Sequence, residues 1–288
     1  MEALFNRIAE WLKDLLVDAT MDRMTGLFDA VNSQVGQAAA DVGASPDSFM
    51  PSIFSMVRDI SESVIMPIAG IILTFVACYE LVKLVTDNNN LANLDTWIFF
   101  KWVFKTAIAV MLVTNTFNIV MAVFALGQHV VSGSGGIIQG QTAISEDMLA
   151  NLQETLEAMN VGKLLGVYLE SFILSLTLNI LAIIIFVIVL GRLLEIYLMT
   201  SLAPIPFATL GSREQGMIGQ NFIRSLLALA FQGFLMMICI GIYALLIQNY
   251  SATDDLIGSV WAIVGYTVML AFGLFKTGSL SKSIFDSH

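Results

Sequence analysis

Long apolar runs dominate the chain, and their lengths predict helices that span a membrane. A helix that crosses the hydrocarbon core of a bilayer needs roughly 20 apolar residues. Four runs reach this length without a charged residue, and a fifth is equally apolar until Glu80 and Lys83 near its end. We therefore predict about five spans, at residues 64–85, 106–126, 171–191, 226–247 and 256–275.

One apolar segment, residues 192–224, does not fit a plain spanning helix. Its apolar part, residues 196–210, directly follows Glu195 and contains Pro204 and Pro206. Two prolines remove two backbone donors and break a helix. We predict a broken, re-entrant or interfacial segment in which these prolines form the helix-break motif.

The N-terminal flank, residues 1–59, has the pattern of an amphipathic helix and lacks the uniformly apolar run of a membrane span. Apolar residues recur at helical spacing from Leu4 to Leu16 opposite a mainly acidic face. Helices that seek anionic lipid are normally basic. We expect this amphipathic helix to be extracellular, with its apolar face against a protein partner, a neighbouring copy or the chain's own membrane domain, residues 60–288.

The external loop, residues 127–163, contains two further features. The glycine- and serine-rich run 132–136 predicts a flexible break, and residues 146–160 predict an acidic amphipathic helix. This loop contains one lysine against four acidic residues. Lysine and arginine favour the cytoplasmic side, so the loop is expected outside.

Basic residues cluster in the connections that five spans would place on the opposite face. Six spans would put several of them outside, so we expect a multi-pass cell-membrane protein with its N-terminus outside and its C-terminus cytoplasmic. The basic residues that five spans place on this one face are Lys83, Lys101, Lys105, Arg192, Arg213, Arg224, Lys276 and Lys282.

Composition supports the membrane class and offers little chemistry. The chain has 288 residues, of which 57% are hydrophobic and 12% are charged, whereas soluble domains have about 25% charged residues. The fold class predicted is therefore an all-α, polytopic integral membrane protein. With two histidines and no nucleophile–base pair at a recognisable spacing, we expect no metal, no cofactor and no enzymatic activity.

Polar residues at membrane depth are the candidates for a translocation path. Such groups are costly in lipid and tend to face water or a partner helix, although interhelical hydrogen bonding is the simpler alternative for the amides. Glu170 is equally compatible with a solvated helix end. The candidates are Asn115, Asn118, Glu170, Asn179 and Gln232.

Two local pairings are also expected near the first connection. Glu80 and Lys83 lie about one helical turn apart and can pair with each other. Lys101 and Lys105 can extend toward the phosphates of membrane phospholipid.

Several strings carry a resemblance to a known family. The most specific are Ala-Pro-Ile-Pro-Phe at residues 203–207 and Tyr-Glu-Leu-Val-Lys at residues 79–83, within the longer strings EIYLMTSLAPIPFATLG and ISESVIMPIAGIILTFVACYELVKLV. From about residue 53 to 275, the chain resembles the TrbL-type conjugal transfer proteins. These are polytopic subunits of type IV secretion systems, here of the kind found in integrative elements of Gram-positive bacteria.

The resemblance implies a subunit of the channel that passes single-stranded DNA and its attached protein across the membrane, energised by separate ATPases. We hypothesise that several copies form a ring around this path. Connections 86–105 and 211–224 each carry two basic residues, Lys101 and Lys105 in one, Arg213 and Arg224 in the other. We predict that these connections dock partner subunits, including an ATPase.

The net charge of −10 argues against tight DNA binding, because proteins that hold DNA present basic surfaces. A conduit needs only weak contacts. Two alternatives remain open at this point: a small-solute transporter or ion channel, and a scaffold that holds other secretion subunits without conducting. Transporters often contain paired broken helices, whereas this sequence shows a single broken segment.

Overall fold

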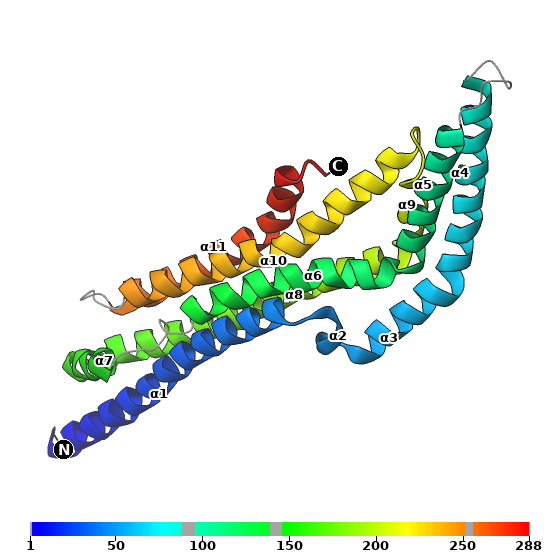
Figure 1. Ribbon diagram of the computed structural model, residues 1–288. Helices are drawn as coiled ribbons and strands as arrows, with labels where there is room; N and C mark the ends of the chain where they lie inside the picture. Colours follow the sequence, from blue (N-terminus) through cyan, green and yellow to red (C-terminus); the bar gives the residue numbers. More distant parts are fainter. Residues whose placement is uncertain (1, 88–95, 139–145, 251–255, 288) are drawn as a thin grey trace. The chain divides into compact units, whose positions relative to one another are not determined.

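The computed structural model describes residues 2–87, 96–138, 146–250 and 256–287, and the regular elements in these ranges are all helical (Figure 1). The chain forms two compact units, each assembled from three separate stretches. Unit 1 comprises Met1–Gly43, Ser132–Val189 and Leu235–Lys276, and unit 2 comprises Ala44–Val131, Leu190–Phe234 and Thr277–His288.

The predicted all-α polytopic class is confirmed. Within the described ranges, six helical stretches are long and apolar enough to cross a membrane. Their apolar side chains are extensively exposed, as expected for surfaces that face lipid or a neighbouring helix instead of water. The stretches are Pro51–Thr86, Trp97–Thr114, Thr116–Gly133, Val161–Leu202, Gly216–Ile247 and Trp261–Ile284.

The count differs from the expected five because the predicted span 106–126 is divided at Asn115. Helix α5 (Thr96–Thr114) ends there and α6 (Thr116–Ile138) begins, and the chain changes direction between them (Figure 1). The Asn115 side-chain amide donates to the carbonyl of Met111 at 2.9 Å, in addition to the bond from its own backbone N–H. Such side-chain bonds compete with the helical ladder and bend it, which hydropathy alone does not register.

Each of the other four predicted spans lies within one long helical stretch. They correspond to α4 (Met66–Asp87) with the turn before it, α8 (Val161–Leu202), α10 (Gly216–Tyr250) and α11 (Leu256–Ile284). The observed helices are longer than the predicted spans, because helix geometry continues into polar residues beyond the apolar run.

The predicted external loop 127–163 is more helical than expected. Its glycine- and serine-rich run, residues 132–136, was predicted to be a flexible break, and this is wrong, since α6 continues through it to Ile138. Backbone hydrogen bonds to the preceding turns outweigh the low helix propensity of glycine. The predicted acidic helix is present as α7 (Glu146–Ala158), and residues 139–145 lie outside the described residues.

In unit 1, helix α1 (Glu2–Gly43) packs against α7. The Arg23 guanidinium of α1 lies 4.7 Å from the centre of the Tyr168 ring on α8 and donates to its hydroxyl at 3.3 Å. Nearer the N-terminus, Trp11 and Leu15 are more than half exposed. Of the predicted apolar face, among the side chains that the structure describes, Ile8, Leu12 and Leu15 are exposed and Leu16 is half-buried.

In unit 2, two short helices lead into the first membrane-spanning stretch. Helices α2 (Pro46–Phe49) and α3 (Pro51–Ile60) follow α1, and a π-helical turn (Ser61–Ile65) joins α3 to α4. Helix α9 (Pro204–Thr209) packs against both α4 and α5. The buried core joins α4, α5, α6, α8, α9 and α10 through Ala69, Leu73, Ala109, Val113, Val120, Phe124, Leu193, Ile196, Ala203, Phe207, Ala208, Leu226, Leu229 and Ala230.

The proline-containing segment is broken, as predicted, but the irregular part is short. Helix α8 continues to Leu202, and Pro204 and Pro206 then occupy the first turn of α9, where a backbone donor is not required. A turn at residues 210–215 leads into α10. A side chain at Gly219 would place its Cβ 2.7 Å from the carbonyl oxygen of Pro206, so this glycine permits the close approach of α10 to α9.

Candidate functional site

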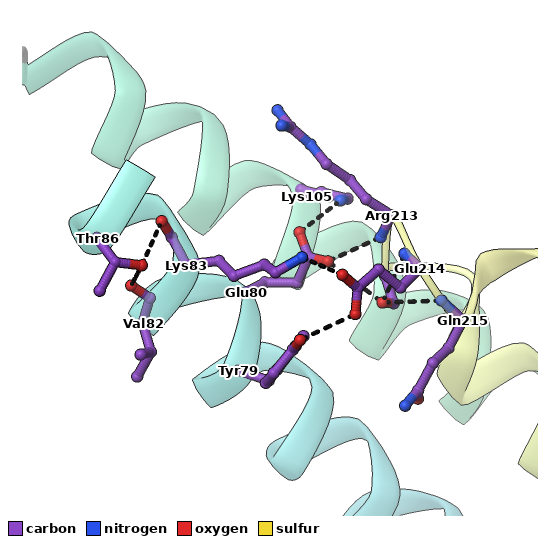
Figure 2. Close-up of polar contacts among 10 residues, drawn as sticks. Tyr79, Glu80, Val82, Lys83, Thr86, Lys105, Arg213, Glu214 and Gln215 are labelled. Carbon is purple, nitrogen blue, oxygen red and sulfur yellow. Dashed lines mark hydrogen bonds and ion pairs between the residues drawn. The ribbon is translucent and has the colours of Figure 1, made fainter. Parts of the chain in front are cut away.

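The polar end of helix α4 carries three neighbouring side chains that point to different partners. Tyr79 and Lys83 are four residues apart and therefore share one helix face, which lies toward Glu214 of the 210–215 turn. Glu80 is rotated by about 100° from Tyr79 and faces Lys105 of α5. One turn of α4 thus contacts two other elements (Figure 2).

Glu80 is the centre of this cluster (Figure 2). Its carboxylate accepts hydrogen bonds from the backbone N–H of Arg213 at 2.7 Å, the Ser212 hydroxyl at 3.2 Å and the Lys105 ammonium at 3.3 Å. Its side chain is 12% exposed. A nearly buried carboxylate is stabilised by several donors, so Glu80 ties the 210–215 turn to α4 and α5.

Ser212 organises the turn itself. Its hydroxyl oxygen accepts from the backbone N–H groups of Glu214 at 3.2 Å and Gln215 at 3.1 Å. These donors precede α10 and have no partner within the helix. Ser212 therefore closes the turn that leads into α10 while it donates its own proton to Glu80.

A second attachment joins the same turn to the outer face of α4. Glu214 pairs with the Lys83 ammonium and accepts from the Tyr79 hydroxyl at 2.9 Å. The hydrogen bond from Lys83, followed by that from Tyr79, lowers the pKa of the Glu214 carboxyl below its ordinary value. Because the Glu214 and Lys83 side chains are 52% and 38% exposed, this ion pair contributes less than the Glu80 contacts.

A pocket with a volume of about 390 Å³ lies beside this cluster. The Trp102 indole on its wall donates to the carbonyl of Ala77 at 3.1 Å and so holds α5 against α4. Its walls come from α4, α5 and the 210–215 turn and consist of Glu80, Lys83, Leu84, Ile98, Lys101, Trp102, Lys105 and Arg213. We call this the basic pocket.

Comparison with known families identifies the chain. Residues 31–204, more than half of its length, match the model of the TrbL/VirB6 plasmid conjugal transfer like proteins. The chain belongs to this family. Neither a curated protein nor a solved structure gave a match.

Membership confirms the resemblance to TrbL-type proteins and places the chain among the membrane components of conjugal transfer and type IV secretion. With its apolar helices, this TrbL/VirB6-like chain is a multi-pass membrane protein. The family match includes α4, α5 and Pro204. It ends before the 210–215 turn, so Ser212, Arg213 and Glu214 lie beyond the matched residues.

Three of the four residues predicted to dock partners lie together in this TrbL/VirB6-like protein. Lys101, Lys105 and Arg213 all line the basic pocket. Arg224 does not, and it pairs with Asp286 at 3.2 Å. Part of the predicted connection 86–105, residues 88–95, lies outside the described residues.

The candidate path residues have different environments. Asn118 and Asn179 are exposed, and exposed Asn115 bonds to its own helix as described above. Gln232 is buried and its amide donates to the Thr277 hydroxyl at 3.5 Å, which matches the interhelical alternative. One carboxylate oxygen of Glu170 is buried without a hydrogen-bond partner among the described residues.

Sequence reasoning missed part of the site. The pairing expected between Glu80 and Lys83 is replaced by ion pairs of each residue to another element. The roles of Ser212 and Glu214 were not foreseen. The run Ser-Arg-Glu-Gln at residues 212–215 has the serine and glutamine spacing of a helix-capping box and was the available signal. The contact with α4 has no local signal, because it joins residues 133 positions apart.

Proposed function

We propose that this protein is the membrane channel subunit of a conjugative type IV secretion system. It forms part of the path for single-stranded DNA and attached protein across the cell membrane. The observation that supports this proposal is membership in the TrbL/VirB6-like family. The chain acts as a conduit without catalysis, and separate ATPases of the system supply the energy.

The exposed surfaces of the helices support an assembly of several copies. Asn118 and Asn179 are polar, exposed and located in helices long enough to span a membrane. Polar residues at such positions are costly against lipid. A ring of copies would place such groups against water in a central path or against a neighbouring helix, and would cover part of the exposed apolar surface.

A contact in unit 2 supports five crossings of the membrane over six. Glu80, near the end of the first span, binds the backbone of Arg213 at 2.7 Å. These residues therefore lie on the same side of the membrane. Three separate crossings by α5, α6 and α8 would put them on opposite sides, whereas α5 and α6 acting as one bent crossing keep them together.

Both basic connections are then cytoplasmic, where the positive-inside rule places them. We propose that the exposed parts of residues 86–105 and 211–224 dock cytoplasmic partners, including an ATPase. This side would then serve the entry of the substrate.

Deletion of the gene tests the proposed system. We expect conjugative transfer to fall to background, while nicking of the DNA and assembly of the relaxase complex in the donor continue. Complementation in trans must restore transfer. Normal transfer frequency in the deletion strain would refute the proposal.

Site-directed crosslinking separates a conduit from a scaffold. In a variant without Cys78 and Cys239, a cysteine at Asn115 or Asn118 is coupled to a photoreactive group during active transfer. We expect adducts with the transferred strand, and none in a strain that lacks the system's ATPases. The buried Gln232→Cys substitution tests whether this residue lines the path or only packs α10 against α11. A conducting subunit must give a strand adduct from at least one of the three positions, and a complete lack of adducts supports the scaffold.

A further inference from the structure

The basic pocket concentrates positive charge in an acidic protein. Lys83, Lys101, Lys105 and Arg213 line it, and they are four of the 13 lysine and arginine residues in a chain of net charge −10. Glu80 is the acidic residue of its walls. The local charge is therefore opposite in sign to that of the whole chain.

Ion pairs within the site neutralise only part of this charge. Lys105 pairs with Glu80 at 3.3 Å, and Lys83 pairs with Glu214. Among the residues that the structure describes, Lys101 and Arg213 form no ion pair with a carboxylate. The Lys101 ammonium instead lies 5.7 Å from the centre of the Trp97 ring. Within the part of the chain that the structure describes, these two cations are therefore available to bind an anion.

The chemistry of these two cations suits a phosphate group. A guanidinium presents paired donors that match phosphate oxygens, and an ammonium adds a compact charge. The remaining acidic group, Glu80, is already engaged by three donors. A phosphate at the pocket therefore meets a net positive surface in spite of this carboxylate.

The location of the pocket indicates where the phosphate comes from. The first candidate span ends at Thr86 and the second begins at Trp97, so the pocket lies at the polar ends of two spans. Tryptophan and lysine are typical of the level of the lipid headgroups. On the same two helices, Val82 of α4 and Phe100 and Phe104 of α5 are each about 60% exposed and offer an apolar surface to acyl chains.

We propose that the basic pocket binds the phosphate of an anionic phospholipid from the cytoplasmic leaflet, with Lys101 and Arg213 as its main ligands. Basic pockets between transmembrane helices bind such headgroups. A zwitterionic lipid would add its own cation to a site that already has two. The bound lipid would join α5 to the 210–215 turn and support the surface proposed to dock partners. The proposal rests on the membrane location of the chain and on the orientation proposed above, and it does not require that the chain conducts DNA.

Tryptophan quenching tests this in the full-length protein reconstituted into phosphatidylcholine vesicles. In a Trp11→Phe, Trp261→Phe background, Trp97 and Trp102 are the remaining tryptophans, and both lie at the site. Titration with phosphatidylglycerol that carries brominated acyl chains should quench them in a saturable step. We expect binding about 30-fold tighter than that of brominated phosphatidylcholine, which corresponds to about 1 kcal/mol for each of the two basic residues.

Matched variants make the assignment specific. The double variant Lys101→Gln, Arg213→Gln should lose the preference for phosphatidylglycerol, and Lys101→Arg, Arg213→Lys should retain most of it. The control Arg224→Gln, Lys282→Gln removes two cations that are already paired with Asp286 and Glu195, and it should bind like the parent. Equal loss in the control would show general attraction of anionic lipid and overturn the site.

Two other ligands are distinguished by the same samples. If inorganic phosphate at millimolar concentration abolished the preference, the site would be one for soluble phosphate. If the glutamine variant kept full lipid binding but no longer co-purified with a secretion subunit, the pocket would take an acidic protein segment. Either result would overturn the lipid assignment, and neither depends on a measurement of DNA transfer.

Discussion

At the scale of single residues, Glu80 has more structural consequences than any of the lysines around it. It lies near the end of α4 and binds a backbone N–H, a hydroxyl and an ammonium from two other elements. Removal of this acceptor leaves the hydroxyl of the buried Ser212 without its acceptor, and an unsatisfied buried group costs more than the hydrogen bond itself contributes. The ion pairs on the surface lack this property, because water replaces a lost partner.

We expect Glu80→Ala to lower the free energy of unfolding by about 1–3 kcal/mol and to release the 210–215 turn. Glu80→Gln keeps an acceptor for the Arg213 N–H and should lose less. The matched control is Glu195→Ala, which breaks an exposed 2.8 Å pair with Lys282 and should cost about 0–1 kcal/mol. Apparent unfolding temperatures in detergent measure the three changes. Equal effects of Glu80→Ala and Glu195→Ala would contradict the role given to Glu80.

Glu214 should make the attachment of the turn dependent on pH. Its pKa in the folded protein is lowered from the ordinary 4.5 by the Lys83 ammonium and the Tyr79 hydroxyl. The resulting stabilisation is fully present above the ordinary pKa, and it is lost as the pH falls through the lowered value. We expect the difference in unfolding temperature between the parent and Glu214→Gln to be constant from pH 7 to about 5 and then to shrink. A difference that stays constant down to pH 3.5 would refute this.

At the scale of elements, small residues determine how closely the helices of unit 2 approach. A Cβ at Gly127 of α6 would lie 2.7 Å from the carbonyl oxygen of Ala230 on α10. Backbone atoms cannot move aside as the end of a flexible side chain can. Close backbone approach through glycine is common between membrane helices, where dispersion and polar contacts replace the hydrophobic effect as the driving force.

Gly127→Ala should therefore separate α6 from α10 and cost about 1–3 kcal/mol, the range typical of overpacked sites. Gly133→Ala is the control in the same helix, because nothing lies within 4 Å of its added Cβ. This control should be neutral or stabilising by up to about 1 kcal/mol, since alanine favours a helix over glycine. Unfolding temperatures of the two purified variants provide the comparison. Equal stability of the two would show that α6 and α10 do not pack closely at Gly127.

At the scale of the whole molecule, the contact between Glu80 and Arg213 limits the number of crossings. It favours α5 and α6 as one bent crossing. With the proposed external N-terminus, α7 would then be external and the 210–215 turn cytoplasmic. Six separate crossings with the same N-terminus would exchange these two locations. The sides of the membrane on which α7 and the 210–215 turn lie therefore distinguish five crossings from six. This distinction does not depend on where each helix enters the lipid.

Cysteine labelling of intact cells measures which positions are accessible from outside and therefore tests this topology directly. In a variant without Cys78 and Cys239, an impermeant maleimide should label Glu154→Cys on α7 and fail to label Gln215→Cys until the cells are permeabilised. Both positions are exposed in the structure. Asp14→Cys reports the N-terminal side and should be labelled from outside. Labelling of Gln215→Cys but not Glu154→Cys would support six crossings.

Hydropathy and turn chemistry predicted much of the fold. The long apolar runs, the acidic helices and the break at Pro204 and Pro206 follow from local rules, and the structure contains them. The bend at Asn115 and the helical run at residues 132–136 were missed. At Asn115 a side-chain bond to the backbone decided the outcome, and at residues 132–136 the continued backbone hydrogen bonds of the helix did. Residue type alone gives a weak indication of either.

The candidate site was predictable by residue type and only partly by arrangement. Lys101, Lys105 and Arg213 were singled out by their charge in short connections, and the structure brings all three to one pocket. Glu214 and Ser212 were not, because their partners on α4 are more than 100 positions away in the sequence.

The sequence by itself determined that this protein lies in a membrane, because runs of about 20 apolar residues leave no other stable environment for its helices. The sequence also indicated the family, because it contains strings that resemble the TrbL-type proteins and because residues 31–204 match the family model. Only the tertiary structure decided which charges meet. Ion pairs and hydrogen bonds form between groups that folding brings within about 3 Å of each other, and that proximity depends on how α4, α5 and the 210–215 turn pack.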